Sequence, residues 1–510
     1  MANKYYKELN EVNAPRGNSP LTGPTLGRRD FFKLAGAGVA GAMVTTGMTP
    51  ELLAASKISA IAPSLINSAR YCIFVLMAGA PSSVDTFDLK QGSWTPSDFN
   101  PTSFSGTMFP QGLMPELAKQ MNKFAIVRSM RAPALVHPLQ QTWAQIARGP
   151  SSALGKIAPN IGSVISLEFE SQRTANQKLP VFVSLNTNFN IVGPGYFNGL
   201  HAPFDVTPAP TGLGSLAHGT AATGDGQAAF EARYNALKAI DTRLRTNSPL
   251  GDDAMTMGSF YDRGKSMMYD PAVDAVFKFT TEEQIRYGGT SMVGQQTVNG
   301  NSFGNSCIVA RNLVKGNLGT RFIHIRHDGW DHHDDIYDTA DDTRLRGRAK
   351  EFDLGMSSLL TDLAATPGTR GGTLLDETLI VWMGEFGRTV GPLTGQNGRD
   401  HYFQHFACFA GAGVTGGKII GTTSADGGYI TEPGWSANRP AQYEDVAATI
   451  YSALGIDYTT TRNDDPFGRG FEYVPFAAQG AWEPINDLFV RSSAPPRSPL
   501  APRDGGRRIG

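Results

Sequence analysis

Histidine and aspartate are concentrated in one stretch, residues 322–335, with the sequence FIHIRHDGWDHHDD. Four of the nine histidines in the chain lie there, beside four aspartates. Imidazole nitrogens and carboxylate oxygens are ligands that divalent ions such as zinc or manganese accept. The first half of the stretch alternates apolar and polar residues, as a strand does, and the second half reads as a loop. The stretch therefore indicates a metal site, with a solvated acidic loop as the alternative.

A second group of polar residues follows the apolar run 379–383. Glu385 comes soon after that run, Arg388 lies three positions further on, and Arg399 and His401 fall in the next predicted loop. A carboxylate, an imidazole and guanidinium groups in this order could supply metal ligands and a clamp for an anion. The competing interpretation is an ion pair that braces two loops.

Polar groups also follow the continuously apolar run 71–77, which reads as a strand buried on both faces. Asp85 and Asp88 lie beyond the carboxyl end of this run, where open α/β sheets bind ligands, although turns and helix caps use the same residue types. His137 and Pro138 precede a helix-like stretch. The partial positive charge of a helix N-terminus favours a bound anion or an activated nucleophile, and a capping role for His137 is the alternative.

Composition narrows the class of protein. The 510 residues permit two or three domains or one large α/β unit, and 40% hydrophobic residues with 58 glycines are typical of a loop-rich globular protein. A net charge of −1 argues against a nucleic acid partner, which requires a strongly basic surface. Cys72, Cys307 and Cys408 are widely spaced and predict no disulfide framework.

The first 56 residues predict a twin-arginine (Tat) signal peptide. Arg28 and Arg29 precede the apolar pair Phe31 and Phe32 and a short, glycine-rich apolar run. That run is too short to anchor the chain across a bilayer, and no membrane span is expected in the mature chain. We therefore expect export through the Tat translocase to the periplasm or cell envelope, with an uncleaved anchor as the alternative.

The predicted elements alternate between strands and helices. Apolar or alternating runs predict strands at 71–77, 124–127, 179–185, 322–325, 379–383 and 405–410. Helical patterns occupy 115–121, 138–149, 227–244, 270–279, 359–365 and 443–454. The order predicts an α/β fold with a mostly parallel sheet and helices on both faces. We expect one domain at 68–490, an inserted lid at about 186–305 and a disordered tail at 491–510.

Five motifs appear in a fixed order. They are VLMAGAPSSVDTFDLK (75–90), GWDHH (329–333), DETLIVWMGEFGRT (376–389), GRDHY (398–402) and AGAGVTGGKIIG (410–421). In this set the chain resembles a widespread family of Tat-exported bacterial proteins that is catalogued as a domain of unknown function. That family is grouped by fold with the alkaline phosphatase and sulfatase superfamily. The resemblance implies an alkaline-phosphatase-like three-layer sandwich with metal ligands at the carboxyl edge of its sheet.

The resemblance also implies a set of metal ligands. Asp331 with His333 would come from the middle loop, and Asp328 with His332 is the rival pair. The remaining implied ligands are Asp85, Glu385 and His401. These residues would hold one or two divalent ions, of zinc, manganese or calcium, that act as Lewis acids on an ester oxygen.

Three positions depart from the superfamily pattern. Phe386 stands where a histidine ligand is expected, and Asp85 comes several residues later than the usual aspartate after the first strand. The segment expected to carry a nucleophile has His137, so His137 itself, Thr142 or Ser129 are the candidates for that role.

Two functions follow from the resemblance. The first is an exported metal-dependent hydrolase of phosphate or sulfate esters, acting on a small-molecule or polymer-borne anionic ester. In it His137 serves as nucleophile or general acid–base, and Arg388 or Arg399 steadies the anionic oxygens. The second is a catalytically degenerate envelope protein that uses the same cleft for binding.

Overall fold

The centre of the fold is strand β1 (Tyr71–Met77), whose seven residues are all buried. The computed structural model describes residues 64–187, 190–213, 226–245, 251–289 and 303–489. The predicted signal peptide (1–56) and the predicted tail (491–510) lie outside these residues. β1 pairs in parallel with β7 (Phe322–His327) on one side and with β8 (Thr378–Met383) on the other. The two polar motif stretches therefore leave the sheet on either side of β1.

Within these described ranges, eight strands form the central sheet, in the order β12-β4-β11-β8-β1-β7-β5-β6. The other members are β4 (Phe124–Arg131), β5 (Phe182–Leu185), β6 (Phe204–Val206), β11 (Gln404–Ala410) and β12 (Ile419–Ile420). β11 runs antiparallel to both of its neighbours, and the remaining pairs are parallel. The predicted mostly parallel sheet is confirmed, although the apolar run at 405–410 does not indicate that its strand is reversed.

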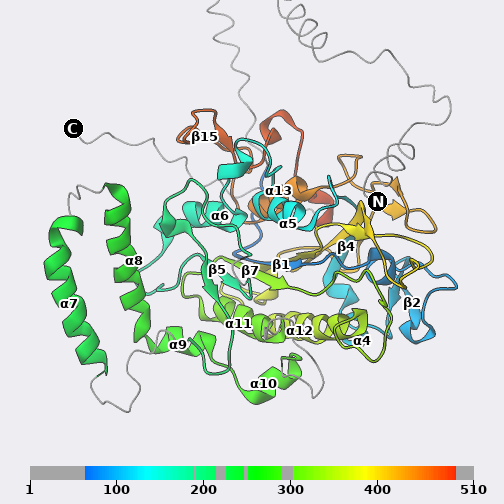
Figure 1. Ribbon diagram of the computed structural model, residues 1–510, viewed down its shortest axis with the longest axis horizontal. Helices are drawn as coiled ribbons and strands as arrows, with labels where there is room; N and C mark the ends of the chain where they lie inside the picture. Colours follow the sequence, from blue (N-terminus) through cyan, green and yellow to red (C-terminus); the bar gives the residue numbers. More distant parts are fainter. Residues whose placement is uncertain (1–63, 188–189, 214–225, 246–250, 290–302, 490–510) are drawn as a thin grey trace, which may run out of the picture. The chain divides into compact units, whose positions relative to one another are not determined.

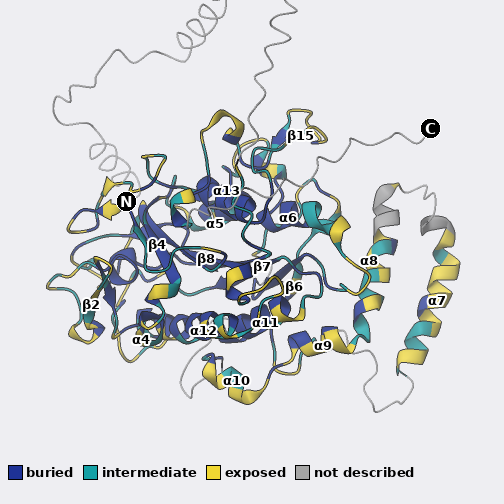
Figure 2. Cartoon of the chain, turned by 180° about the vertical axis from the view of Figure 1, so that it is seen from behind, coloured by how far each residue is buried: buried dark blue, intermediate teal, exposed yellow. Residues whose placement is uncertain are grey.

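Helices cover both faces of the sheet, as predicted (Figure 1). Alternate side chains of β1 enter two separate cores, because successive residues of a strand point to opposite faces. One core includes α4 (Pro115–Ala118), α11 (Phe303–Gly316) and α12 (Leu345–Ala365). The other includes α5 (His137–Ile146), α6 (Ile161–Phe169) and α13 (Tyr443–Ala453). Figure 2 shows that the sheet and the helices flanking it are largely buried. The three cysteines are free and buried.

The described part of the chain also contains four short antiparallel strand pairs outside the central sheet. They are β2–β3 (Pro101–Phe104, Thr107–Pro110), β9–β10 (Gly387–Arg388, His401–Tyr402), β13–β14 (Thr422–Thr423, Ile430–Glu432) and β15–β16 (Thr461–Arg462, Phe471–Glu472). The β9–β10 pair matters most for the site, because it places His401 opposite Arg388.

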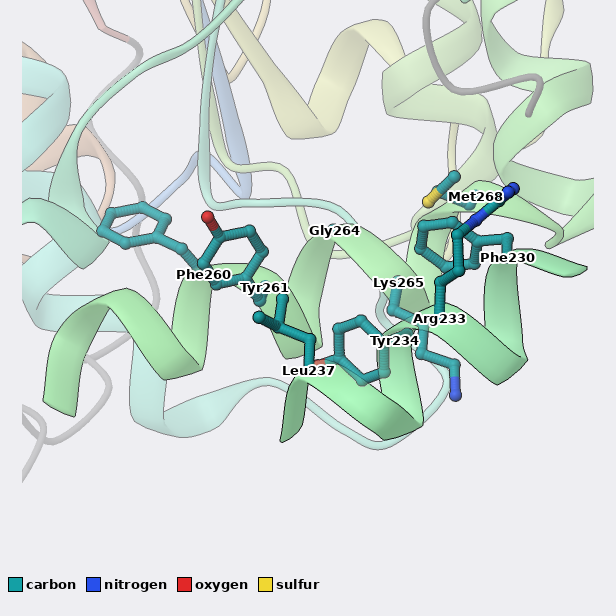
Figure 3. Close-up of a pocket in the computed structure, with 9 residues that line it drawn as sticks. All are labelled: Phe230, Arg233, Tyr234, Leu237, Phe260, Tyr261, Gly264, Lys265 and Met268. Atoms are coloured by element: carbon teal, nitrogen blue, oxygen red, sulfur yellow. The ribbon is translucent and has the colours of Figure 1, made fainter. Parts of the chain in front are cut away.

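The region predicted to form an insertion is mainly helical. Its described part includes β6, which forms one edge of the central sheet, and continues with α7 (Gly226–Arg245), α8 (Asp252–Met268), α9 (Pro271–Phe277) and α10 (Thr281–Arg286). α7 and α8 pack side by side around a pocket of about 420 Å³, lined by aromatic residues with Arg233 and Lys265 (Figure 3). Within the described residues, no helix has the length and apolar character needed to cross a membrane. A lid role for this region stays a prediction.

Gly79 lies where the end of β1 meets the loop after β7. Its φ is +102°, and a Cβ there would stand 2.5 Å from the backbone nitrogen of Asp331 and 2.8 Å from that of Trp330. Only glycine allows this close approach of two backbones.

We predict that Gly79→Ala lowers the free energy of unfolding more than Gly106→Ala does, by at least about 1 kcal/mol. Gly106 also has a positive φ, +81°, but a Cβ there meets nothing within 4 Å. The pair therefore separates backbone strain from a steric clash. Urea denaturation of both variants measures the difference, and equal losses would contradict a tight contact at Gly79.

Candidate metal centre

Four side chains converge at the carboxyl edge of the sheet: His137, Asp331, His333 and His401. One ligand atom from each lies within 4.8 Å of the others. His401 Nε2 is 3.0 Å from His137 Nε2 and 3.1 Å from His333 Nε2. Asp331 Oδ1 is 2.9 Å from His333 Nε2, 3.2 Å from His137 Nε2 and 4.0 Å from His401 Nε2. We refer to these four residues as the His₃Asp cluster.

Each part of the cluster comes from a different local structure. His137 is the first residue of α5, where Pro138 suits the opening turn because a helix leaves its first amides unpaired. His401 belongs to β10. Asp331 and His333 lie in the loop after β7, which is fixed because Trp330 is buried and its amide donates to Ala78 O at 3.2 Å. The sheet thus brings together residues from distant parts of the sequence.

The remaining ring nitrogens determine how the three imidazoles present their lone pairs. Nδ1 of His137 lies 2.6 Å from Glu385 Oε1, and Nδ1 of His333 lies 2.8 Å from Asp400 Oδ1. Nδ1 of His401 lies 2.9 Å from the carbonyl oxygen of Leu135. Carbonyls and ionised carboxylates only accept hydrogen bonds, so each Nδ1 carries a proton and donates it. In the neutral imidazoles every Nε2 then has a lone pair directed into the cluster.

This arrangement fits a divalent cation. Lone pairs on nitrogens 3.0 and 3.1 Å apart repel each other unless a positive charge lies between them. Three imidazole nitrogens and one carboxylate oxygen form a donor set that borderline cations bind. The hydrogen bonds from Nδ1 to carboxylates and a carbonyl are also the usual support for metal-ligating histidines. Among the residues that the structure describes, this is the cluster of histidine and acidic side chains with that spacing.

In the protein without metal, a proton occupies part of the cluster. Burial lowers the pKa of His137, but hydrogen bonds to Asp331 and Glu385 outweigh it and raise the pKa to about 9. Burial lowers the pKa of His401, and the nearby Arg388 charge adds to that effect. Burial opposes ionisation of Asp331, yet His137 and Arg388 hold the pKa of that carboxyl well below its usual range. A protonated His137 next to an ionised Asp331 is the expected state at neutral pH.

Arg388 is buried and contacts the cluster residues Asp331 and His333. Its Nε donates to Ala80 O at 2.9 Å, and its two terminal nitrogens donate to Gly79 O, Arg399 O and the Asp331 carboxylate. One terminal nitrogen also lies 3.2 Å from His333 Nε2. Because protein acceptors already engage these donors, Arg388 differs from the predicted anion clamp: it holds the loops and adds a fixed positive charge.

Glu385 is a predicted metal ligand, but in the structure it contacts the cluster residue His137 and is not itself part of the cluster. Its Oε1 accepts hydrogen bonds from His137 Nδ1, from Gly79 N at 2.9 Å and from Gln141 Nε2 at 2.8 Å. Its Oε2 accepts from Ala80 N at 3.2 Å. Burial raises the pKa of Glu385, but these donors more than offset it and lower the pKa. The carboxylate is consequently ionised and saturated with protein donors.

Asp85 and Arg399 also differ from the predicted roles. Arg399 Nε donates to Asp85 Oδ2 at 2.6 Å, and both side chains are buried. Tyr337 donates to the other Asp85 oxygen at 2.6 Å. Neither residue reaches the His₃Asp cluster, because this ion pair braces two loops, which is the competing interpretation of the sequence.

Asp328 and His332, the rival pair of predicted ligands, are not part of the cluster. Asp328 accepts a hydrogen bond from Arg326 at 2.8 Å. His332 is buried with its Nε2 3.2 Å from Thr343 O, and burial lowers its pKa to about 4. The structure therefore brings Asp331 and His333 into the cluster, and leaves Asp328 and His332 out of it.

Neither hydroxyl considered as a nucleophile turns towards the cluster. The Ser129 hydroxyl is buried and donates to Pro433 O at 2.7 Å, whereas that of Thr142 donates to Pro138 O at 2.8 Å. His137 Nε2 is inside the cluster. Asp400 is a supporting residue that sequence reasoning misses, although its place between Arg399 and His401 in the GRDHY motif is a signal that could identify it.

We predict that His333→Ala and His401→Ala lose bound divalent metal, because each removes one lone pair from the cluster. The loss in affinity should exceed the roughly 10- to 100-fold that removal of a supporting residue produces. Equilibrium dialysis followed by elemental analysis measures it. His201→Ala is the control, since His201 Nδ1 lies 3.2 Å from the Ser166 hydroxyl and outside the cluster. Equal retention in all variants would contradict the assignment.

Metal affinity should depend on pH in one direction. Folded, metal-free protein holds a proton on His137 up to a pKa of about 9, and a bound cation must displace it. We therefore predict that the apparent Kd for zinc rises about tenfold for each pH unit below 9, until other groups titrate. Calorimetric titrations in buffers of different ionisation enthalpy should show proton release on binding. A Kd that is constant from about pH 6.5 to about pH 8.5 would contradict the raised pKa.

Comparison with known proteins identifies the family of the chain. The family described as "Protein of unknown function (DUF1501)" matches residues 69–473. None of the curated proteins compared with the chain matches its sequence.

Solved structures with a related chain path share little sequence with this chain. A protein in the alkaline phosphatase superfamily from Vibrio parahaemolyticus is 10% identical, with a TM-score of 0.34 over 76% of this chain and 67% of that one. The lipoteichoic acid synthase LtaP from Listeria monocytogenes is 10% identical, with a TM-score of 0.33 over 82% and 78%. The phosphonate monoester hydrolase SpPMH from Silicibacter pomeroyi is 11% identical, with a TM-score of 0.33 over 80% and 76%.

Proposed function

This chain belongs to the DUF1501 family of proteins of unknown function, and we propose that it is an exported, metal-dependent hydrolase of phosphate or sulfate esters. The observation that carries the proposal is the convergence of three imidazole Nε2 atoms and one carboxylate oxygen at the carboxyl edge of the sheet. That edge is where open α/β sheets place their ligand sites.

A single divalent cation fits the His₃Asp cluster. His137, His333, His401 and Asp331 would hold it, and three nitrogen donors favour zinc or manganese over calcium, which prefers oxygen ligands. When bound, the cation supplies Lewis-acid polarisation of an ester oxygen. One ion is expected because Glu385, Asp85 and Asp328, the other carboxylates proposed as ligands, are engaged by protein donors.

The protein's own side chains give a substrate access to the cluster and place a positive charge next to it. The Asp331 side chain is 46% exposed, so the cluster opens to solvent and a substrate can reach it. Arg388 lies beneath the cluster, and its fixed positive charge lowers the energy of an anion above it, as a preorganised electrostatic site requires. Because His137 would be a ligand, we assign it neither the nucleophile role nor general acid–base work. A water molecule is the remaining attacking group.

The substrate and compartment are part of the same proposal. An anionic ester, small or borne on a polymer, is attracted by the positive charges of Arg388 and of the divalent cation, and the cation can act on it as a Lewis acid. The Arg28–Arg29 pair supports export through the Tat translocase to the periplasm or cell envelope.

One observation favours a binding protein as the second candidate. The Ser129 and Thr142 hydroxyls are turned to backbone carbonyls, and both Arg388 and Arg399 are bound by protein groups. A chain with this arrangement would bind a ligand at the metal centre without cleaving it.

We predict about one equivalent of zinc or manganese in protein purified from the periplasm, together with turnover of at least one substrate in a panel of aryl phosphates and aryl sulfates. Asp331→Asn and His401→Ala should lower kcat/KM at least about 100-fold, and His201→Ala should leave it unchanged.

The outcomes separate the two candidates. Stoichiometric metal without turnover on any ester would favour the binding protein. Absence of bound metal, combined with no turnover, would overturn the proposal.

A further inference from the structure

Glu385 is a buried carboxylate that points at a metal-ligand histidine without itself reaching the cluster. We infer that Glu385 is the positioning residue that makes His137 the strongest of the three imidazole ligands. The inference rests on the metal centre of the proposed function, and it is independent of which ester, if any, the protein cleaves.

The contacts of Glu385 fix its place. It is 0% exposed, and its Oε1 accepts three hydrogen bonds, from His137 Nδ1 at 2.6 Å, Gln141 Nε2 at 2.8 Å and Gly79 N at 2.9 Å. His137 and Gln141 lie on α5, and Gly79 lies just beyond the end of β1, so the carboxylate ties α5 to the sheet. A side chain held by this many donors cannot swing towards the cluster, and it holds the His137 ring in one orientation.

The three Nδ1 acceptors are chemically unequal. His137 donates to a buried carboxylate, and His333 donates to the Asp400 carboxylate, which is 58% exposed. His401 donates to a neutral backbone carbonyl. A negative charge in a low-dielectric interior acts more strongly on its partner than one screened by water. The electron density at Nε2, and with it the strength of the metal bond, should therefore be greatest for His137.

Phe386 packs against the same imidazole. Its ring centroid lies 4.5 Å from the His137 ring and 4.6 Å from the His401 ring. Consecutive residues thus provide a hydrogen-bond acceptor and a packing surface for the same imidazole. The GEFGRT motif carries both functions, with Arg388 two positions later binding Gly79 O while Glu385 binds Gly79 N.

The test compares Glu385→Gln with the matched variant Asp400→Asn. The amide introduced by Glu385→Gln would keep an oxygen for Nδ1 of His137, but it would lose the charge and present an NH₂ group to Ala80 N. Zinc affinity is measured by competition with a chromophoric chelator, and cobalt(II) absorption reports the ligand field. We expect Glu385→Gln to weaken zinc binding about 10- to 100-fold and to shift the cobalt bands, and Asp400→Asn to weaken it less than about tenfold.

If the Glu385→Gln variant does not fold, a measurement on the wild-type protein tests the inference instead. In wild-type protein with labelled histidine and bound zinc, proton–nitrogen NMR should show Nδ1–H on His137, His333 and His401. The His137 Nδ1 proton should be furthest downfield, since its acceptor is a desolvated carboxylate.

Three outcomes would each overturn the inference. The first is a zinc Kd of Glu385→Gln within about twofold of wild type, with only the metal-free melting temperature lowered. The second is an equal loss of zinc affinity in Asp400→Asn, and the third is a His137 Nδ1 proton that is not the furthest downfield. Wild-type protein that binds no zinc would overturn both this inference and the proposed function. Zinc binding in the expected order without ester turnover would support the inference and contradict the hydrolase.

Discussion

The buried guanidinium of Arg388 constrains the whole edge of the sheet. Its donors reach Gly79 O and Ala80 O after β1, Arg399 O before β10, and the Asp331 carboxylate after β7. A guanidinium has five donors in one rigid plane, and leaving any of them unpaired in the interior is costly. The loops must therefore present their acceptors together, which fixes the positions from which Asp331 and His401 project. The charge of Arg388 also offsets part of the negative charge that Asp331, Glu385 and Asp400 bring to the cluster.

Much of the architecture could be predicted because it depends on local patterns. The unbroken apolar run Tyr71–Met77 identifies the central strand, and the runs that form β7 and β8 identify its neighbours. Parallel neighbours end at the same edge, so two remote motif stretches have to meet there. The reversed direction of β11 cannot be read from the sequence, since an apolar run gives the position of a strand and not its sense.

The roles of single acidic residues are harder to predict because they depend on partners far along the chain. Asp85 is neutralised by Arg399, 314 positions away, and Glu385 is held by donors 244 to 306 positions away. The sequence supplies a carboxylate at each position, but only tertiary structure separates a ligand from a brace. His332 and His333 illustrate the same limit, since adjacent residues of a loop point in opposite directions: one bonds Thr343 O inside and the other joins the cluster.

The packing of Phe386 against two imidazoles has a kinetic consequence. With its ring 4.5 Å from that of His137 and 4.6 Å from that of His401, and with each Nδ1 hydrogen-bonded, the rings lose their rotational freedom during folding. An arriving ion then has little side-chain entropy left to remove. Its capture should be limited by how fast the hydrated cation sheds water and not by rearrangement of the loops, so exchange-labile ions should load sooner than inert ones.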